Sequence, residues 1–170
     1  MYFKEILNLK KDECGLLDLN ELLNLLPNTP KDVLSQFFYD HGRNCDFQEQ
    51  YGHLEITKLK WKEVELKADE IIKSSFYEDY SDYIIGVSER LNKFEKEDFF
   101  CIDIREKVVN NWKIKKTWLR TPIFLDAKLL AKSNKLHLVE GHTRFGILKG
   151  LLSKKIISEN SIHKIWFGEY

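Results

Sequence analysis

The residues best suited to chemistry lie together at positions 136–152, in the run LHLVEGHTRFGILKGLL. Its first residues are mostly apolar and predict a short strand. The four residues from Glu140 predict a polar turn, and the remaining residues predict an amphipathic helix that begins at Arg144. A strand, a glycine-containing turn and a helix N-terminus form an anion-binding geometry, because free backbone N–H groups and the positive end of the helix dipole converge there. We therefore predict a site for a phosphate or a carboxylate.

Each residue of this turn has an expected role. Gly141 gives the backbone a freedom that a side chain would forbid, and the planar guanidinium of Arg144 suits an anion. Thr143 is placed as the helix N-cap, with its hydroxyl facing the anion. His142 is expected to be exposed, either as an acid, base or phosphate ligand near neutral pH or as a plain turn residue. Glu140 could orient His142, act as a base, or pair with Arg144.

The loop that precedes the last strands could cover the site. Arg120 and Lys116 would add positive charge, and Trp118 would offer a flat surface to a base or ring. The alternative is that Trp118 is a core anchor and that Lys116 is solvated. The turn itself also has an alternative interpretation, in which Arg144 only pairs with a carboxylate such as Glu140.

The spacing of these residues also resembles a known motif. An apolar strand, then G-x-x-R, then a helix is similar to the phosphate-binding motif of the ParB/sulfiredoxin-like fold, with GERR in ParB nucleotide-binding domains and GCHR in sulfiredoxins. Here the four positions are Gly141, His142, Thr143 and Arg144. The catalytic cysteine of sulfiredoxin falls on His142, so sulfinic-acid chemistry is not implied. The first arginine of ParB falls on Thr143. The resemblance begins near Thr121 and implies a phosphate-bearing ligand, such as a nucleotide with Mg²⁺.

No metal site and no catalytic residue are predicted. His137, His142 and His163 could meet across a sheet, but their spacing does not indicate a metal cluster. The three cysteines are far apart and form no C-x-x-C pair, which is typical of reduced thiols in a cytoplasmic protein. Motifs of P-loop proteins, serine hydrolases and zinc proteases are absent from the sequence. Whether a reaction is catalysed stays open.

The composition argues against some classes of binding partner. The 170 residues are 43% hydrophobic and 32% charged, with 27 basic and 27 acidic residues, so the formal net charge is zero. Such a chain has no general attraction for nucleic acid or for anionic membranes, and we predict no strong nucleic-acid binding. The apolar runs are too short to cross a membrane, and the first residues do not resemble a signal peptide. We expect one cytoplasmic domain over residues 1–170.

The elements that position the turn are expected in residues 112–170. Strands at 122–125, 136–139 and 162–167 should share one small mixed sheet, with the Arg144 helix packed on it. Gly146 and Gly150 each cost that helix about 1 kcal/mol of propensity, which suggests a close approach by another backbone. The fold class is α+β or α/β, with a ParB/sulfiredoxin-like core and a helical N-terminal half.

Residues 1–111 are expected to be mainly helical. Asp18 caps one helix in a capping box with Glu21, Pro30 starts a second, and residues 80–91 form a third. Residues 46–52 are interpreted as a packed loop, 54–57 as a strand and 61–74 as a helix, while residues 99–111 fit either type.

The leading hypothesis is a small protein that binds a phosphate-bearing ligand, with Glu140, Gly141, His142, Thr143, Arg144, Arg120 and Trp118 as the ligand-binding residues. The alternative is a non-catalytic module that binds a protein partner, such as a toxin-neutralising immunity protein. Its interface would use aromatic residues within 37–51 and 76–83.

Overall fold

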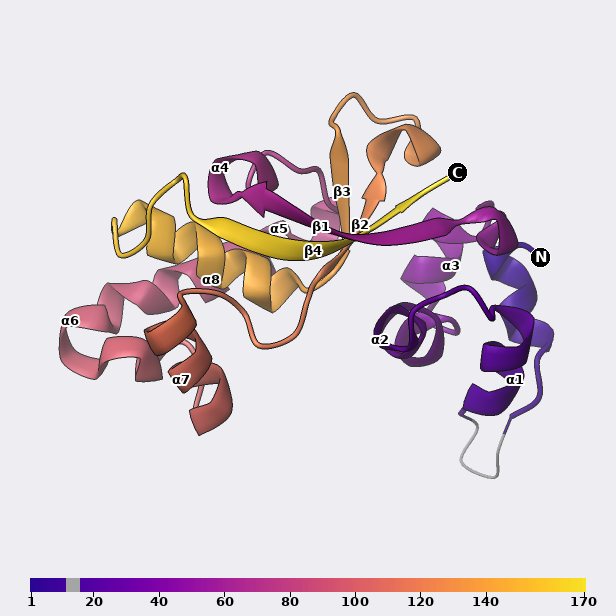
Figure 1. Cartoon of the computed structure of the whole chain (residues 1–170), viewed down its shortest axis with the longest axis horizontal. Helices are drawn as coiled ribbons and strands as arrows, with labels where there is room; N and C mark the ends of the chain where they lie inside the picture. Colours follow the sequence, from indigo (N-terminus) through magenta and orange to yellow (C-terminus); the bar gives the residue numbers. More distant parts are fainter. Residues whose placement is uncertain (12–15) are drawn as a thin grey trace.

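A four-stranded mixed sheet forms the centre of the structure, a computed structural model that describes residues 1–11 and 16–170 (Figure 1). Its strands are β1 (Lys60–Lys67), β2 (Ile123–Asp126), β3 (Leu136–Glu140) and β4 (Ile162–Glu169). The order is β1-β4-β2-β3; β4 runs antiparallel to β1 and parallel to β2, and β3 runs antiparallel to β2. The three strands predicted in the second half are therefore confirmed, and the fold class is α+β. Cys14 and the end of the N-terminal lead-in lie outside the described residues.

The helices surround this sheet. In the described residues the α-helices are α1 (Leu19–Leu25), α2 (Lys31–Val33), α3 (Cys45–Tyr51), α4 (Ala68–Ile71), α5 (Ser81–Glu89), α6 (Phe94–Glu97), α7 (Glu106–Lys115) and α8 (His142–Ser153). The 3₁₀ segments are η1 (Phe3–Asn8), η3 (Ile56–Lys58), η4 (Glu78–Tyr80), η5 (Arg90–Lys93), η6 (Asp98–Cys101) and η7 (Ala127–Leu130), and η2 (Leu34–Tyr39) is a π-helical continuation of α2. None of these helices has the length and apolar character needed to cross a membrane.

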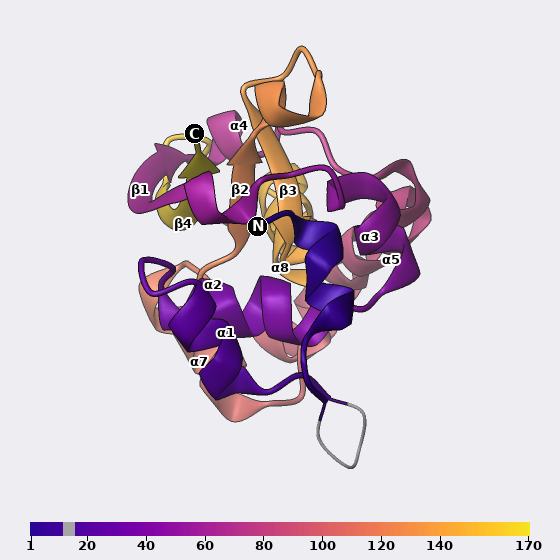
Figure 2. The ribbon, with the colours of Figure 1, turned by 90° about the vertical axis from the view of Figure 1, so that its right-hand side faces the viewer.

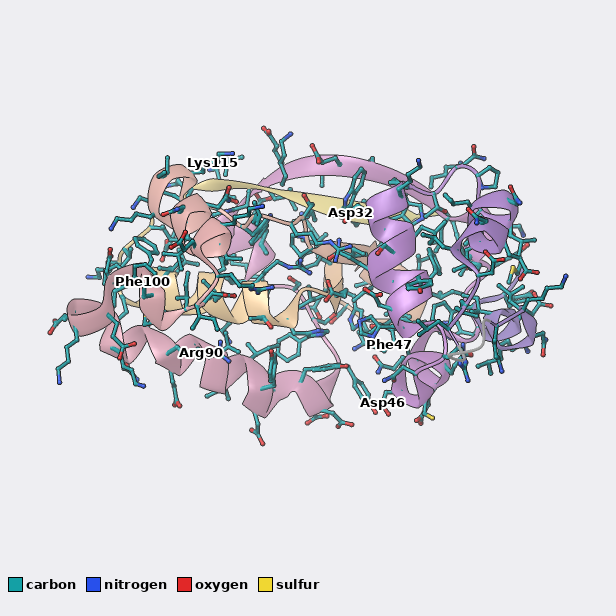
Figure 3. The ribbon with its side chains drawn as sticks, turned by 90° about the horizontal axis from the view of Figure 1, so that it is seen from below. Asp32, Asp46, Phe47, Arg90, Phe100 and Lys115 are labelled. Atoms are coloured by element: carbon teal, nitrogen blue, oxygen red, sulfur yellow. The ribbon has the colours of Figure 1, made fainter. Side chains whose placement is uncertain are left out.

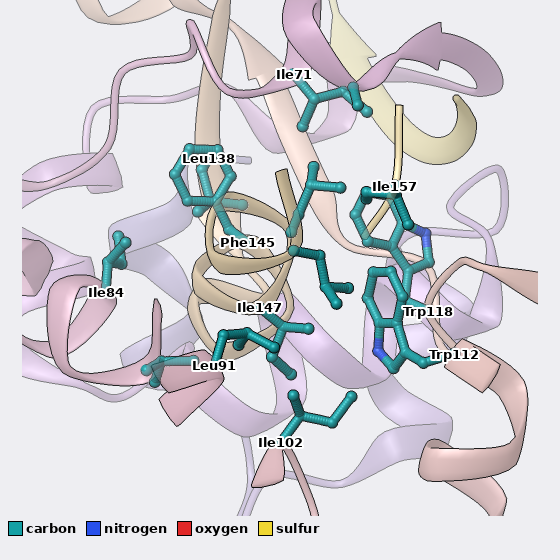
Figure 4. Packing of buried hydrophobic residues seen from close by; sticks show 14 of the residues in the cluster. Ile71, Ile84, Leu91, Ile102, Trp112, Trp118, Leu138, Phe145, Ile147 and Ile157 are labelled. Carbon is teal, nitrogen blue, oxygen red and sulfur yellow. The ribbon is translucent and has the colours of Figure 1, made fainter. Parts of the chain in front are cut away.

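Each face of the sheet has its own core. On one face Phe124, Leu138 and Ile165 pack with α5 and α8, and Figure 4 shows Phe145 and Ile147 of α8 in this cluster. The opposite face carries a second set of apolar side chains, which packs against α1, η2 and α3. Helices α5–α8 thus gather at one end of the molecule and α1–α3 at the other (Figure 1), and Figure 2 views the molecule from the end that carries α1–α3.

Helices α5 and α8 approach closely where two glycines lie. A Cβ atom on Gly146 would come within 2.8 Å of the Val87 Cβ, and one on Gly150 within 2.7 Å of the Ser88 carbonyl oxygen. Such distances leave no room for a methyl group. The close approach predicted from these two glycines is confirmed, and the neighbour is a helix.

The prediction of a helix over residues 61–74 is wrong for its first half. Residues 60–67 form β1, which pairs with β4 from Lys60↔Glu169 to Lys67↔Ile162. Val64 and Leu66 alternate inward, and ion pairs such as Lys164–Glu63 (2.7 Å) link the two strands. Pairing with a strand 100 residues away overrides the helical spacing, which applies only from Ala68 onward.

Two predictions between residues 44 and 58 are also wrong. Residues 46–52 are helical rather than a loop, because the Asn44 side chain accepts the amide protons of Asp46 and Phe47 and caps α3. Residues 54–57 do not form a strand: Glu55 makes an isolated bridge with Tyr2, and η3 begins at Ile56. Residues 99–111, left undecided by their spacing, form η6 and the first part of α7.

Other predictions in the first half are confirmed. Asp18 caps α1 through its carboxylate, although Glu21 accepts the Lys10 amide proton instead of closing a capping box. The third predicted helix is α5. The apolar stripe of α2 and η2 is completely buried, and its members are Val33, Leu34, Phe37 and Phe38.

Candidate functional site

The turn between β3 and α8 follows the predicted order, but its cap differs. Gly141 has a φ of +106° and is the N-cap, and its carbonyl oxygen accepts the Phe145 amide proton at 2.9 Å. The placement of Thr143 as N-cap is therefore wrong, because the helix begins at His142 and Thr143 lies in the first turn. A Cβ atom at position 141 would meet Pro122 at 2.6 Å and the Arg144 Nε at 3.0 Å. Both the backbone and the space require glycine here.

Arg144 folds back over this glycine and is mostly buried. Its Nη2 donates to the Glu140 carboxylate and to the Gln36 Oε1, the latter at 2.8 Å. The Glu140 pair expected as the alternative role of Arg144 is therefore present. Burial lowers the pKa of Arg144, and the charge of Glu140 opposes that shift. The buried Nε of Arg144 has no hydrogen-bond partner in the described part of the chain, so one donor beside the turn is unused.

The N-terminal helices reach the same site through Asp32 and Gln36. The Asp32 carboxylate accepts from Arg120 Nε (2.8 Å), Gln36 Nε2 (2.9 Å) and Trp166 Nε1 (3.2 Å). Gln36 is buried, and its Nε2 also donates to the Thr121 carbonyl oxygen at 3.1 Å. Figure 3 shows the helix that carries Asp32 beside the end of α8. Sequence spacing gave no sign of these contacts, because 85 or more positions separate Asp32 and Gln36 from their partners around the turn.

Three arginines from separate segments face one cavity of about 330 Å³, which we call the arginine pocket. Arg105 immediately precedes α7, Arg120 lies in the loop before β2, and Arg144 lies in the first turn of α8. The pocket is lined by Asp103, Arg105, Val108, Trp112, Trp118, Leu119, Arg120, Glu140, Gly141, Thr143, Arg144 and Ile147. Of the predicted ligand-binding residues, all except His142 line it. Arg105 and Asp103 were not predicted.

Carboxylates pair with the other two guanidinium groups as well. Arg105 donates from Nε and Nη2 to Asp103 at 2.9 and 2.6 Å, and this pairing lowers the pKa of Asp103. Arg120 donates from Nε to Asp32 and from Nη2 to Ser35 at 3.3 Å. A guanidinium has five N–H donors in a rigid fork, so each retains N–H groups beyond these contacts. The pocket thus combines fixed cations with spare donors.

His142 is buried rather than exposed, which corrects its predicted placement. Its ring lies nearly parallel to that of Tyr80, with the centroids 3.8 Å apart, and its Nε2 has no partner among the described residues. Burial lowers the pKa of His142 to about 3, and the nearby His41 and Arg144 add to that shift. The ring is therefore neutral near pH 7, and it does not face the arginine pocket. An acid role near neutral pH does not fit this environment.

Trp118 forms part of the apolar wall and offers no open flat surface. It is 5% exposed, its Nε1 donates to the Lys164 carbonyl oxygen at 2.8 Å, and its ring meets Trp112 edge-on. The predicted alternative, a core anchor, describes it better. Thr143 lies at the edge of the pocket, where its hydroxyl and that of Tyr83 are 2.6 Å apart.

A metal cluster of histidines is not formed. His137 interacts with Ser75 and Tyr51, whereas His163 interacts with Thr117 and Ser161. In the part of the chain that the structure describes, no three His, Cys, Asp or Glu side chains are grouped to hold a metal ion. Glu140 and Asp103 are the carboxylates in the arginine pocket, so a Mg²⁺ ion bound there would also need oxygen ligands from a phosphate.

The fold and site define an α+β chain with an arginine-lined pocket at a helix N-terminus. Comparison with protein-family models, with curated proteins and with solved structures finds no match.

Proposed function

We propose that the chain binds a phosphate-bearing ligand in the arginine pocket. The observation that carries this proposal is the convergence of Arg105, Arg120 and Arg144 on the first turn of α8. The amides of that turn have no partners within the helix, and the helix dipole favours negative charge there. Charge-assisted bonds from arginine to phosphate are among the strongest hydrogen bonds in proteins. A volume of about 330 Å³ suits a small ligand.

The proposed class of ligand rests on the arginine side chains of the pocket and on a resemblance in sequence. The G-x-x-R sequence at Gly141–Arg144 is similar to the phosphate-binding motif of the ParB/sulfiredoxin-like fold, in which a nucleotide with Mg²⁺ would be the ligand. The two carboxylates of the pocket, Glu140 and Asp103, pair with Arg144 and Arg105, so phosphate oxygens and water would supply most of the ligands of such an ion. The separated cysteines favour a cytoplasmic setting for this activity.

A thermal-shift panel tests the proposal. Inorganic phosphate, pyrophosphate and nucleoside mono- and triphosphates are added to the protein with and without Mg²⁺. A ligand that binds the folded chain raises its melting temperature by mass action, and we expect at least one phosphate compound to do so. Arg105→Gln and Arg120→Gln should reduce the shift without unfolding the protein, because their side chains are 73% and 45% exposed and surface ion pairs contribute little to stability.

Lys154→Gln is the matched control. This residue lies just after the C-terminal end of α8 and is exposed, so removing its charge should leave the shift unchanged. No shift with any of these compounds would contradict the proposal, as would an equal loss in the Lys154 variant.

A non-catalytic interaction module is the second candidate function, but one of its two predicted aromatic surfaces is buried. Phe37, Phe38, Phe47 and Tyr51 are buried, so they cannot form the aromatic interface expected within residues 37–51. Within residues 76–83, Tyr83 is exposed at 47%, so that part of the prediction stands as a prediction. Large apolar side chains are exposed elsewhere, and Ile104 beside the arginine pocket is the most exposed of those described. That observation favours a partner surface next to the pocket.

A further inference from the structure

A second, more open hollow of about 520 Å³ adjoins the arginine pocket. Asp103 and Arg105 line both hollows, so the two meet at this ion pair, and we call the two hollows together the arginine groove. The second hollow is lined by Arg90, Lys93, Phe100, Cys101, Ile102, Asp103, Ile104 and Arg105. Figure 3 shows Arg90 and Phe100 at the end of the molecule away from Asp32. A ligand that fills the whole groove is longer than a single phosphate compound.

The groove is positively charged although the chain as a whole is neutral. Its lining contains five cationic side chains, Arg90, Lys93, Arg105, Arg120 and Arg144, and two acidic ones, Asp103 and Glu140; a third carboxylate, Asp32, pairs with Arg120 from outside the lining. The formal net charge of the whole chain is zero. This local excess is complementary to a ligand that carries negative charge at more than one point.

Exposed apolar side chains flank the same groove. Ile104, between Asp103 and Arg105, is 91% exposed, and Leu119 on the other side of the arginine pocket and Phe100 in the second hollow are also exposed. Two of these three are aliphatic, and the tryptophans of the pocket are buried. Apolar side chains of a peptide can pack on such exposed residues, whereas stacking of successive nucleobases needs a series of open aromatic faces, to which the described residues that line the two hollows contribute only Phe100.

We propose that the ligand of the arginine groove is a phosphorylated segment of a protein partner. The phosphate of a modified serine, threonine or tyrosine enters the arginine pocket, an apolar neighbour packs on Ile104 and Phe100, and an acidic residue lies near Arg90 and Lys93. Recognition of phosphate by an arginine cluster, with flanking contacts for specificity, is an established way to bind peptides. This inference rests on the proposed function, because it requires phosphate binding in the pocket.

The test measures fluorescence anisotropy with three kinds of labelled probe. The first kind is three degenerate nine-residue peptide libraries, centred on phosphoserine, phosphothreonine and phosphotyrosine; the second is the same libraries unphosphorylated; the third is a ten-residue oligothymidylate. We expect one phosphorylated library to bind about tenfold or more tightly than its unphosphorylated form and than inorganic phosphate measured by competition, which corresponds to about 1.4 kcal/mol. Ile104→Ser should remove most of that gain and leave the competition by inorganic phosphate unchanged.

Ile114→Ser is the matched control for Ile104→Ser. Ile114 is also highly exposed, at 77%, but it lies outside both hollows, so its substitution should not alter peptide binding. Tighter binding of the oligothymidylate than of every phosphopeptide library would overturn the inference in favour of single-stranded nucleic acid. Equal binding of phosphopeptides and inorganic phosphate would overturn it while the proposed function stands. Failure of inorganic phosphate and of all phosphopeptides to bind would overturn the inference, and it would overturn the proposed function as well if the thermal-shift panel also gives no shift.

Discussion

Arg144 links the turn, the N-terminal helices and the arginine pocket through one guanidinium. Its partners Glu140 and Gln36 are both shielded from water, and Glu140 retains about a quarter of its side-chain exposure. Arg144→Ala would leave the Glu140 carboxylate without its cation. We expect the free energy of unfolding to fall by about 2–4 kcal/mol. Breaking a fully buried ion pair costs about 3–5 kcal/mol, and the cost is lower here because this pair is partly exposed to solvent. Urea denaturation at pH 7 measures the change.

A second variant distinguishes two causes of the lost stability, the broken ion pair and the lost packing of the arginine side chain. Glu140→Gln combined with Arg144→Ala removes the stranded charge, so the double variant should be more stable than Arg144→Ala alone. Equal or lower stability of the double variant would show that the Glu140 charge is not the source of the loss.

The parts of the site that could be predicted from sequence are local. Gly141 and Arg144 are three residues apart, and a strand, a glycine turn and a helix fix their geometry within that short stretch. The burial of His142 depends on Tyr80, and the position of Arg144 depends on Gln36; both partners are distant in the chain. Spacing along the sequence carries no information about such contacts. Arg105 was missed for the same reason, since only the folded chain brings it to the turn.

At the scale of elements, the contact between α5 and α8 depends on Gly146. Gly146→Ala should improve helix propensity by about 1 kcal/mol, but the new methyl group would lie 2.8 Å from the Val87 Cβ and 2.9 Å from the Ile84 carbonyl oxygen. Separating the helices costs about 1–3 kcal/mol, so we expect the thermal midpoint to fall. Differential scanning calorimetry measures it.

Gly86→Ala on α5 is the control for this substitution. A Cβ atom there would meet no heavy atom within 4 Å, and the residue is exposed. The same chemical change should therefore raise the free energy of unfolding by about 0.5–1 kcal/mol. A stabilised Gly146→Ala variant would show that the two helices move apart at little cost.

Helices with an apolar stripe and a capping residue, such as α1, were predicted correctly, whereas β1, whose partner strand is distant in the chain, was not. Asp18 and the leucines of α1, and the apolar stripe of η2, are sufficient to indicate helices. β1 becomes a strand only because β4 lies beside it, and its own Lys and Glu residues suit an exposed helix face equally well. The capping side chain of Asn44 was the local sign of α3 that the interpretation as a loop overlooked.

At the scale of the whole molecule, three buried histidines make stability depend on pH. Burial lowers the pKa of His137 and of His142 to about 3 and that of His163 to about 4, whereas each has its ordinary value near 6.5 when unfolded. The unfolded chain therefore binds more protons below pH 6.5, and stability is lost as the pH falls from 6.5 towards 3–4. At pH 5 we expect a loss of up to about 2 kcal/mol for each histidine, measured by urea denaturation.

Two histidine variants show where this dependence arises. His137→Gln should reduce the difference in stability between pH 7 and pH 5, because the residue at position 137 no longer takes up a proton on unfolding. This holds even if the variant is less stable than the original protein at both pH values. His53→Gln should leave the difference unchanged, since His53 is exposed. A molecule equally stable at pH 7 and pH 5 would contradict the expectation.

The order of strands in the sheet also has a consequence for biosynthesis. β4 lies between β1 and β2, yet residues 162–169 are made long after residues 60–67. A ribosome adds residues in the order of the sequence, so β1 has no partner strand until about a hundred further residues have been added. This takes about 5–20 s at ordinary rates of synthesis. During that interval β2 can pair only with β3. The apolar side chains that pack against β4 in the folded protein remain exposed to water. The nascent chain is thus most exposed to proteases and to holdase chaperones just before Ile162 emerges, and a ribosome paused there would prolong that state.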